Sequence, residues 1–369
     1  MSSIKNYLLP AALILIFLSA SGCTNSIFHF NDADYPSIDH GDETPEYISV
    51  EDTFSFQDSE VSVKFFVDTI LYEDAKNADK SVYLYDDLSD DEWSSEYYRS
   101  FVGNEYMDEV YEAVLGSLRQ VRDRMSLDDD EYAELLSVYV QSIPYQTDDV
   151  LTDPRYPVEI VYDNYGDCDD KSILLAGLLL KEGYDVALFE FDDEEHMNVG
   201  IRSSGCQYRD TGYASIETTE VNLIGWEKIE IGDDVLLDSD PLVITFDNEG
   251  GLWYTSCGEV QEIYDAFESS AESCEDLSAR IEKGEAELDS LEAEINSLNK
   301  MLDQLKKNGQ VSQYNSKVQS YNSKVNTYNQ KADALQSLVD EYNECVGVYN
   351  TILEKQYDRK GLYEYVRSL

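Results

Sequence analysis

A heptad pattern in the last hundred residues constrains the fold more than any other feature of this chain. Apolar and tyrosine side chains recur at steps of three and four along two stretches, which are separated by Asn308-Gly309. Heptad spacing gives a helix one apolar side that a second helix can cover, and Asn-Gly breaks a helix. The pattern therefore predicts an antiparallel coiled-coil hairpin over residues 266–357, in which an arm of about 40 residues rises about 60 Å. The expected seam comprises Leu277, Ile281, Gly284, Leu288, Leu291, Ile295, Leu298, Leu302, Leu305, Val311, Tyr314, Val318, Tyr321, Val325, Tyr328, Ala332, Leu335, Val339, Tyr342, Val346, Tyr349 and Leu353.

The charge balance limits the classes of partner. The chain carries 26 Lys and Arg residues against 77 Asp and Glu residues, a formal net charge of −51. A nucleic-acid partner is not expected, because neutralising phosphates requires clustered Lys and Arg. Apolar residues remain plentiful, which disfavours wholesale disorder. We interpret the acids as a solvated, self-repelling surface; a cation-binding surface is the alternative, with only a loose calcium-loop pattern at 163–167.

The N-terminus has the pattern of an export signal over residues 1–22. Lys5 precedes an apolar run that is short for a membrane span, and Ala20-Ser21-Gly22 then precedes Cys23. This resembles a lipoprotein cleavage site and predicts a lipid anchor on Cys23, with the body held at the outer face of the cell membrane. A plain secretory signal is the alternative. Residues 23–55 are acidic and rich in Ser and Pro, and we expect them to form a flexible tether.

Two disulfides are expected in such an exported protein. Cys274 and Cys345 lie at nearly equal distances from the Asn308-Gly309 turn, so folding back brings them level. By elimination, Cys206 and Cys257 form a second expected pair. The alternative is that these cysteines are unpaired.

The middle of the chain predicts a mixed α+β body. Residues 61–67 are strand-like, and residues 104–125 carry apolar side chains at helical spacing. A second helix is expected from Asp130 to Ser142, because Pro144 follows. We expect residues 56–130 to form an α/β segment that packs on a core at 131–262, and residues 358–369 to form a C-terminal tail.

Cys168 is the candidate nucleophile. The segment 165–172 that contains it directly precedes an apolar run at 173–180, and the expected helix ends near Gly183. A cysteine at a helix start faces the positive end of the helix dipole. His196 and Glu217 follow on two strand-like stretches. The other two histidines lie in the expected tether, so a histidine-dependent mechanism in the body must use His196. Nucleophile, base and carboxylate are the set that cysteine-based acyl transfer requires.

The stretch from about residue 131 to 228 resembles the transglutaminase-like superfamily, in an archaeal-type branch. The resemblance covers about a quarter to a third of the chain and leaves out the heptad region. It depends on the order and spacing of several short motifs. These motifs are Val140-Gln141-Ser142-Ile143-Pro144-Tyr145, Arg155-Tyr156-Pro157-Val158-Glu159, Gly166-Asp167-Cys168-Asp169-Asp170, Leu174-Leu175-Ala176-Gly177-Leu178-Leu179, Gly183-Tyr184-Asp185-Val186, His196-Met197-Asn198-Val199, Ile216-Glu217-Thr218-Thr219 and Gly225-Trp226.

The resemblance implies a papain-like α+β core, in which the nucleophile begins a helix that packs on an antiparallel sheet. It implies Cys168 as nucleophile, His196 as base and acid, and Glu217 as the carboxylate that orients the imidazole. That carboxylate is often Asp in the wider family, so Glu217 would use a longer side chain. We also considered Gln141 as a donor to the oxyanion, against an ordinary helix position.

The expected reaction is attack by the Cys168 thiolate on a peptide or amide carbonyl, followed by release of an amine and resolution by water or another amine. Peptidases, amidases and transglutaminases share this acyl-enzyme. Neighbouring aspartates oppose the thiolate, but we expect His196 to dominate its pKa. No glycine-rich phosphate loop or His/Cys cluster occurs, so no metal or cofactor is expected.

A non-enzymatic scaffold is the competing interpretation. The chain would then be a tethered body that presents the coiled-coil arm to a protein partner, since heptad seams commonly mediate association. Cys168 would be an inert buried thiol, and His196 and Glu217 ordinary polar residues. A third alternative is that the hairpin packs on the body merely as structure.

Overall fold

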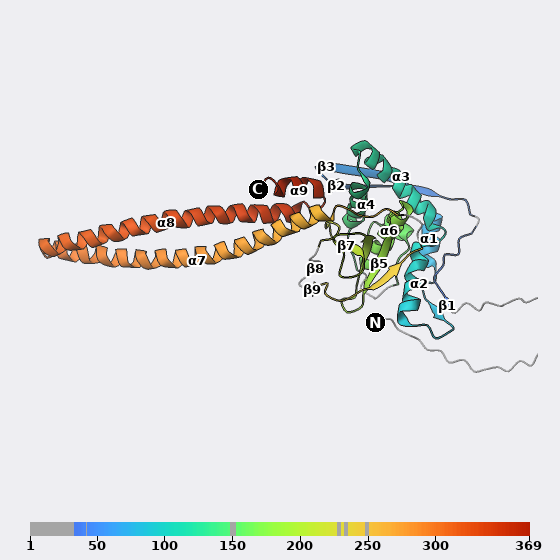
Figure 1. The fold of residues 1–369 in the computed structure, drawn as a ribbon, viewed down its shortest axis with the longest axis horizontal. Coiled ribbons are helices and arrows are strands. Elements are labelled where there is room, and N and C mark those ends of the chain that lie inside the picture. The colour runs from blue at the N-terminus through green and yellow to red at the C-terminus, as the bar shows by residue number, and fades with distance from the viewer. Residues whose placement is uncertain (1–32, 42, 148–152, 227–229, 232–234, 248–250) are drawn as a thin grey trace, which may run out of the picture.

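The computed structural model describes residues 33–369 except residue 42 and the segments 148–152, 227–229, 232–234 and 248–250. It is a mixed α+β body from which two long helices project as an arm (Figure 1). The expected signal segment and Cys23 lie outside the described residues. Within the part that is described, no helix combines the length and the apolar character that crossing a bilayer requires.

The body begins with a β-hairpin where the sequence predicted a tether. Strand β2 (Tyr47–Phe56) pairs antiparallel along its whole length with β3 (Ser59–Asp68). The expectation of a flexible segment up to residue 55 is therefore wrong for residues 47–55. Alternating apolar residues in β3 are buried, and pairing with β3 satisfies the backbone of the more polar β2. A separate short pair joins β1 (Ala33–Asp34) to β4 (Tyr83–Leu84).

Among the residues described before Cys168, five segments are helical. They are α1 (Thr69–Asn77), α2 (Asp90–Val102), α3 (Met107–Met125), α4 (Asp129–Ser142) and α5 (Pro157–Asp163). The predicted apolar face of α3 is buried, as its helical spacing requires. Helix α4 begins with a capping box between Asp128 and Glu131 and ends before Pro144, close to the predicted bounds.

Helix α6 (Cys168–Lys181) packs between α4 and a four-stranded antiparallel sheet. The strand order is β10 (Leu242–Thr245), β5 (Val186–Phe191), β6 (His196–Arg202) and β7 (Tyr213–Ile216). A smaller apolar cluster with Phe189 and Phe191 covers the face that α6 leaves open. A two-stranded pair, β8 (Glu230–Ile231) and β9 (Val235–Leu236), follows β7.

One glycine explains how closely α3 approaches α6. A Cβ atom at Gly177 would lie 2.1 Å from Cζ of Tyr111, whose ring is buried against α6. The Tyr111 hydroxyl donates to the backbone oxygen of Val102 at 3.0 Å, which fixes the ring in place. Glycine at 177 lowers the helix propensity of α6, but it leaves the room that the Tyr111 ring needs.

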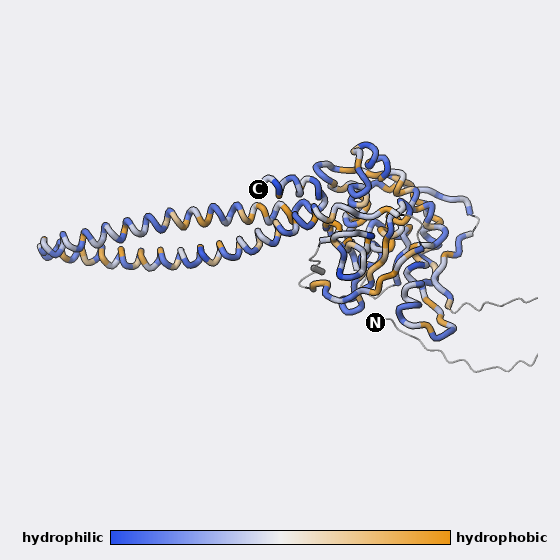
Figure 2. Tube along the Cα trace, viewed as in Figure 1, coloured by the Kyte–Doolittle hydropathy of each residue, from blue (hydrophilic) through white to orange (hydrophobic). Residues whose placement is uncertain are grey.

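The predicted helical hairpin is confirmed. Helix α7 (Cys257–Lys307) and helix α8 (Val311–Glu354) run antiparallel and are joined at Asn308 and Gly309, which adopts a positive φ of 67°. Orange apolar positions recur along both helices in Figure 2. Gly284 in the seam lies opposite Leu335, where a Cβ would be 2.9 Å from Cδ1.

The base of the arm differs from the prediction in two respects. Helix α7 begins at Cys257 rather than near 266, because its first turns bury Val260 and Ile263 in the core of the body. At the end of α8, Leu353 is 43% exposed whereas Ile352 is fully buried. The seam therefore stops before Leu353, since the last turn of α8 packs on the body instead of on α7 alone.

Both expected cysteine pairs are bonded in the structure. Cys274 and Cys345 join α7 to α8 with their Cα atoms 5.8 Å apart. Cys206 and Cys257 join the loop after β6 to the start of α7 with a Cα separation of 5.2 Å. The first pair fixes the register of the arm, and the second holds the arm's base to the sheet.

The C-terminal tail is a helix that returns to the body, α9 (Arg359–Val366). Buried Arg359 donates from Nε to Glu134 at 2.5 Å and also pairs with Glu259 in α7. Lys360 pairs with Glu131 at 2.9 Å. The expectation of a plain tail is therefore incomplete, because these ion pairs connect α9 to α4 and to the base of the arm.

Candidate active site

The start of α6 positions Cys168. Asp167 is the N-cap, and its side chain accepts from the backbone N–H of Asp170, whose own carboxylate accepts from the N–H of Asp167. This capping box fixes Cys168 as the first residue of the helix. Cys168 is half-buried and is the free cysteine of the described residues.

The sheet supplies the second component through Met197. Pairing between β6 and β7 extends only to Val199 with Ile216, so the backbone of Met197 has no β7 partner. Its carbonyl accepts from Ser172 Oγ at 3.1 Å, and its N–H donates to the sulfur of Cys168. The thiol therefore lies beside β6 at Met197, the residue that follows His196.

His196 and Glu217 form a buried pair. His196 Nε2 lies 2.9 Å from Glu217 Oε2, and both side chains are almost fully buried. The other carboxylate oxygen, Oε1, accepts from the backbone N–H groups of Thr218 and Thr219 and from Thr219 Oγ1. Burial alone would raise the pKa of Glu217, but His196 and the Thr219 donors outweigh it and the pKa is lowered. Glu217 is thus held as a carboxylate.

Geometry decides which imidazole nitrogen is available. Nε2 is engaged with Glu217, which leaves Nδ1 for proton transfer. His196 stands opposite Phe191 in β5, so its ring lies on the sheet face that α6 does not cover. No hydrogen bond joins Cys168 to His196 in the described structure. The two residues are neighbours through Met197 but are not a bonded ion pair.

The thiol of Cys168 is held in its neutral form. Burial raises its pKa most, and the charges of Asp169 and Asp167 raise it further, while the Met197 N–H opposes them. The expectation that His196 would dominate this pKa is therefore wrong. The physical reason is that the sulfur is largely shielded from water and its nearest charges are negative.

Gln141 does not have the role considered for it. Its Nε2 donates to the backbone oxygens of Glu217 at 2.7 Å and of Asn222 at 3.0 Å, so both amide hydrogens are used. The opposite amide orientation would place oxygen against two carbonyl oxygens, which excludes it. Gln141 therefore fixes the backbone that carries Glu217 instead of donating to an oxyanion.

Lys171 is a site residue that the sequence analysis missed. It is fully buried one turn after Cys168, and Nζ donates to the backbone oxygens of Gln141 at 3.1 Å and Ile143 at 2.8 Å. Burial lowers its pKa to about 8, against the charge of Glu217, which raises it. The only signal in the sequence was a lysine two residues before the apolar run of this helix.

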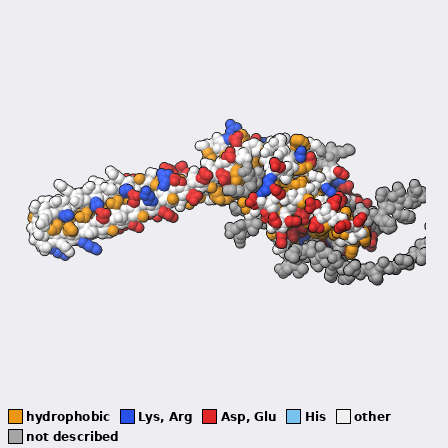
Figure 3. All heavy atoms as spheres, turned by 60° about the horizontal axis from the view of Figure 1, so that its bottom comes forward, with side chains coloured by type: hydrophobic (Ala, Val, Ile, Leu, Met, Phe, Trp, Pro, Cys, Tyr) orange, Lys and Arg blue, Asp and Glu red, His pale blue; other side chains and the backbone are white. Residues whose placement is uncertain are grey.

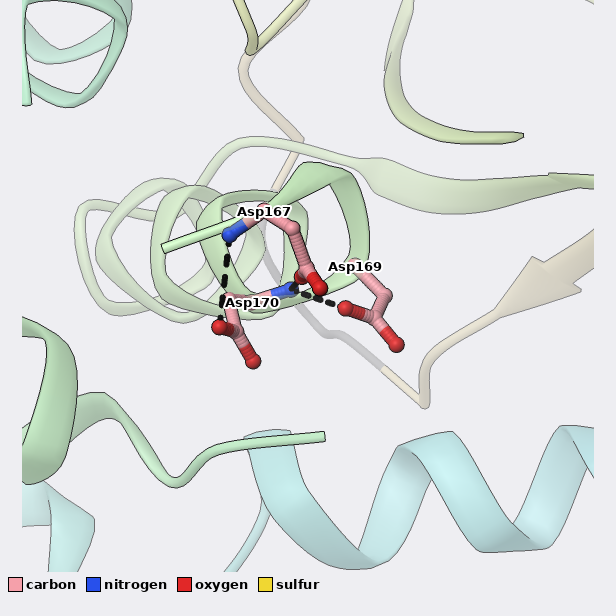
Figure 4. A group of neighbouring side chains, drawn as sticks. All are labelled: Asp167, Asp169 and Asp170. Carbon is pink, nitrogen blue, oxygen red and sulfur yellow. Dashed lines mark hydrogen bonds between the residues drawn. The ribbon is translucent and has the colours of Figure 1, made fainter. Parts of the chain in front are cut away.

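Three carboxylates at the start of α6 lie within 4.8 Å of one another (Figure 4). Asp167 and Asp170 form the capping box, and the Asp169 side chain also accepts from the backbone N–H of Asp170 at 2.8 Å. Arg155 donates its backbone N–H to Asp170 at 2.6 Å. Capping and this contact account for the cluster, so it gives no independent indication of a metal.

Two tyrosines flank Cys168. Tyr145, 49% exposed, follows α4 and pairs with Gly166 through an isolated bridge. Burial raises its pKa to about 12, and the negative charge of Asp167 also raises it. Tyr98 in α2 also lies within electrostatic range of Cys168.

Comparisons of this chain with models of protein families, with curated proteins and with solved structures found no match. Any functional assignment therefore depends on the geometry of the site and on the motifs of the sequence.

Proposed function

We propose that this chain is a cysteine-dependent acyl-transfer enzyme with a papain-like core, acting on a polypeptide or amide. One arrangement carries the proposal: the sulfur of a free cysteine at a helix start contacts the strand residue beside a buried His–Glu pair. The start of α6 supplies Cys168, the start of β6 supplies His196, and the residue after β7 supplies Glu217. The transglutaminase-like resemblance of the sequence supports the same assignment.

The first chemical step makes the acyl-enzyme. His196 Nδ1 takes the thiol proton of Cys168 as the sulfur attacks the carbonyl carbon, and the carbonyl electrons move to oxygen. The N–H groups of Cys168 and Asp169 in the first turn of α6 are the available donors to that oxyanion, because the Asp170 N–H is used by the capping carboxylates. The imidazolium then protonates the departing amine as the C–N bond breaks, and Glu217 stabilises the positive ring throughout.

The second step resolves the acyl-enzyme. His196 removes a proton from water or from an amine, which attacks the thioester carbonyl, and the proton returns to the Cys168 sulfur. Water gives a peptidase or amidase, and an amine gives a transglutaminase. Because the resting group is a thiol, His196 acts as a general base during attack and does not hold a preformed thiolate.

The proposed enzyme is exported and anchored at the outer face of the cell membrane through a lipid on Cys23. This part rests on the N-terminal sequence alone. The two bonded cysteine pairs are consistent with it, since disulfides persist in oxidising compartments.

A binding scaffold is the second candidate function. The raised pKa of Cys168 favours it, because a neutral buried thiol is a poor nucleophile, and the long arm is a means of presenting a surface. In that case the His196–Glu217 pair would have only a structural role.

Acylation by a small activated ester distinguishes the two. The full chain carrying Cys23→Ser is treated with p-nitrophenyl acetate, and mass spectrometry of the peptide that contains Cys168 measures the acetyl adduct. We expect rapid acetylation that His196→Ala slows by about 10²–10⁴-fold. His40→Ala is the matched control, because His40 pairs with Asp74 in the N-terminal region and should leave the rate unchanged.

Equal acetylation rates in the original chain and the His196→Ala variant would refute the enzymatic proposal. If the adduct forms as expected, adding an amine such as glycine ethyl ester separates transfer from hydrolysis. Amide product formed faster than the free acid indicates a transglutaminase, and the reverse indicates a hydrolase.

A further inference from the structure

The far end of the arm has the opposite charge to the rest of the chain. Residues 295–332 contain six lysines and a single acid, Asp303, which gives a net charge of +5. The remaining residues contain 20 Lys and Arg against 76 Asp and Glu. Figure 3 shows the contrast, with red acidic side chains over the body and blue and orange side chains at the end of the arm.

The seam of the arm explains why the lysines at this end are unpaired. Two ion pairs cross between the helices at steps of seven residues: Lys331 with Glu287, and Lys324 with Glu294. The same step places Lys317 opposite Met301 at the next position towards the turn. Lys317 continues the series of lysines on α8, but α7 has Met301, 41% exposed, at the position where a third glutamate would complete the next ion pair.

This end of the arm forms a basic surface with apolar members. We call it the basic tip; it comprises Lys300, Lys306, Lys307 and Lys317 with Met301 and Val311. All six are exposed, Val311 by 68%. Among the described residues, no carboxylate lies within ion-pair distance of these four lysines. The basic tip therefore offers charge and apolar area that the chain itself does not cover.

The body carries a segment of complementary chemistry. Residues 83–92, the acidic segment, place five carboxylates and no Lys or Arg in ten positions. None of the five has an ion-pair partner among the described residues, and Tyr83, Leu84 and Tyr85 beside them are 44–67% exposed. The segment joins β4 to the start of α2, on the side of the body away from the arm (Figure 1).

We propose that the basic tip binds the acidic segment of a second copy of this chain, head to tail. The tip cannot reach its own segment, because the disulfide-braced arm points away from the body. Such a contact joins two different surfaces, so it can extend to further copies.

Repulsion between the acidic bodies does not prevent this arrangement. The first turns of α7 lie in the body, so the remaining arm of about 40 residues, at 1.5 Å per residue, holds two successive bodies about 60 Å apart. That distance exceeds the Debye length of about 8 Å at physiological ionic strength many times over. The bodies are therefore screened from one another, whereas tip and segment are in contact.

Sedimentation velocity of the full chain in a neutral detergent tests the proposal. We expect concentration-dependent association at about 0.05 M NaCl that is lost at about 0.5 M, since screening shortens from over 10 Å to a few Å. The tip variant Lys306→Glu/Lys307→Glu/Lys317→Glu and the segment variant Asp86→Lys/Asp87→Lys/Asp91→Lys should each be monomeric. The control Lys64→Glu/Arg124→Glu/Lys283→Glu changes net charge as the tip variant does and should associate as the original chain does.

Mixing the two variants gives the decisive measurement. The acidified tip of one and the basic segment of the other are again complementary, and so are the unchanged segment and the unchanged tip. A 1:1 mixture should therefore associate although neither variant does so alone. A monomeric original chain at low salt, or association that the tip variant retains, would overturn the proposal. So would a tip that binds vesicles containing anionic phosphatidylglycerol while the chain remains monomeric, because the partner would then be a lipid surface.

Discussion

The Nε2 atom of His196 lies 2.9 Å from Oε2 of Glu217, and the other oxygen of that carboxylate is occupied by donors from Thr218 and Thr219. The carboxylate is therefore fixed on both sides and selects which imidazole nitrogen stays available. This relationship gives the histidine a defined orientation whether or not the neighbouring thiol is in use.

Replacing the Glu217 carboxylate by an amide should keep a hydrogen-bond partner for the His196 ring but remove the negative charge beside it. In Glu217→Gln the ring loses its anionic partner, so an imidazolium formed in the reaction is no longer stabilised. We expect acetylation of Cys168 to slow by about 10²–10⁴-fold with little loss of stability. Glu195→Gln, in the exposed turn before β6, is the control. An unchanged rate in Glu217→Gln would show that the pair has no catalytic role.

Removing the Gln141 amide should damage the site from a distance. Gln141→Leu leaves the carbonyl oxygens of Glu217 and Asn222 without their buried donors, at about 1–3 kcal/mol for each unsatisfied group. We expect urea denaturation to show a free energy of unfolding lower by that order. Gln313→Leu, on the exposed surface of α8, should change it by less than about 0.5 kcal/mol. Equal effects of the two substitutions would contradict the structural role of Gln141.

Lys171 should make stability depend on alkaline pH. Burial lowers its pKa from 10.5 in the unfolded chain to about 8 in the folded protein. Between these values the unfolded chain binds more protons, so the contribution of Lys171 to the free energy of unfolding rises with pH. Below pH 8 the amine is charged in both states and this contribution is constant. The full change corresponds to about 3 kcal/mol.

Urea denaturation of the original chain and Lys171→Met at several pH values from about 7.5 to 10 isolates this contribution. The difference in unfolding free energy should move in favour of the original chain as pH rises. Lys181→Met, at the partly exposed end of the same helix, should give no such trend. Parallel pH curves for the original chain and Lys171→Met would mean that the buried amine remains charged on folding.

Gly177 should not tolerate a methyl group. In Gly177→Ala the new Cβ would lie 2.1 Å from the buried Tyr111 ring, and we expect a loss of about 1–3 kcal/mol in unfolding free energy. Gly116→Ala in α3 is the matched control, because no atom lies within 4 Å of its added Cβ. Higher helix propensity should stabilise that variant by about 1 kcal/mol. The change in unfolding free energy is measured by thermal or urea denaturation. A change of the same sign in Gly177→Ala and Gly116→Ala would contradict the close approach of α3 and α6.

The disulfide in the arm should stabilise the helical hairpin. Cys274 and Cys345 are separated by 71 residues, and the chain-entropy relation gives about 4 kcal/mol for a closed loop of that length. In Cys274→Ser/Cys345→Ser we expect the far-UV circular dichroism signal of the arm to melt at lower temperature. Cys206→Ser/Cys257→Ser keeps the arm closed and should affect the body instead. An arm that melts unchanged without Cys274 and Cys345 would show that its seam alone determines its stability.

The sequence by itself determined the elements whose signals are local. The heptads from Leu277 onward and the Asn308-Gly309 break predicted the arm, because period and breaker are properties of adjacent residues. The disulfide between Cys274 and Cys345 could also be predicted, because the two residues lie at nearly equal distances along the chain from the turn. The capped start of α6 at Cys168 was equally local.

Only the tertiary structure decided how distant groups are used. It assigned the amide of Gln141 to two loop carbonyls, buried the amine of Lys171, and placed Tyr47–Phe56 in a strand instead of a tether. It also raises the pKa of the Cys168 thiol, because burial and the nearby aspartates outweigh the Met197 N–H. Hydrogen-bond partners and desolvation depend on which residues the fold brings together, and no spacing along the chain encodes them.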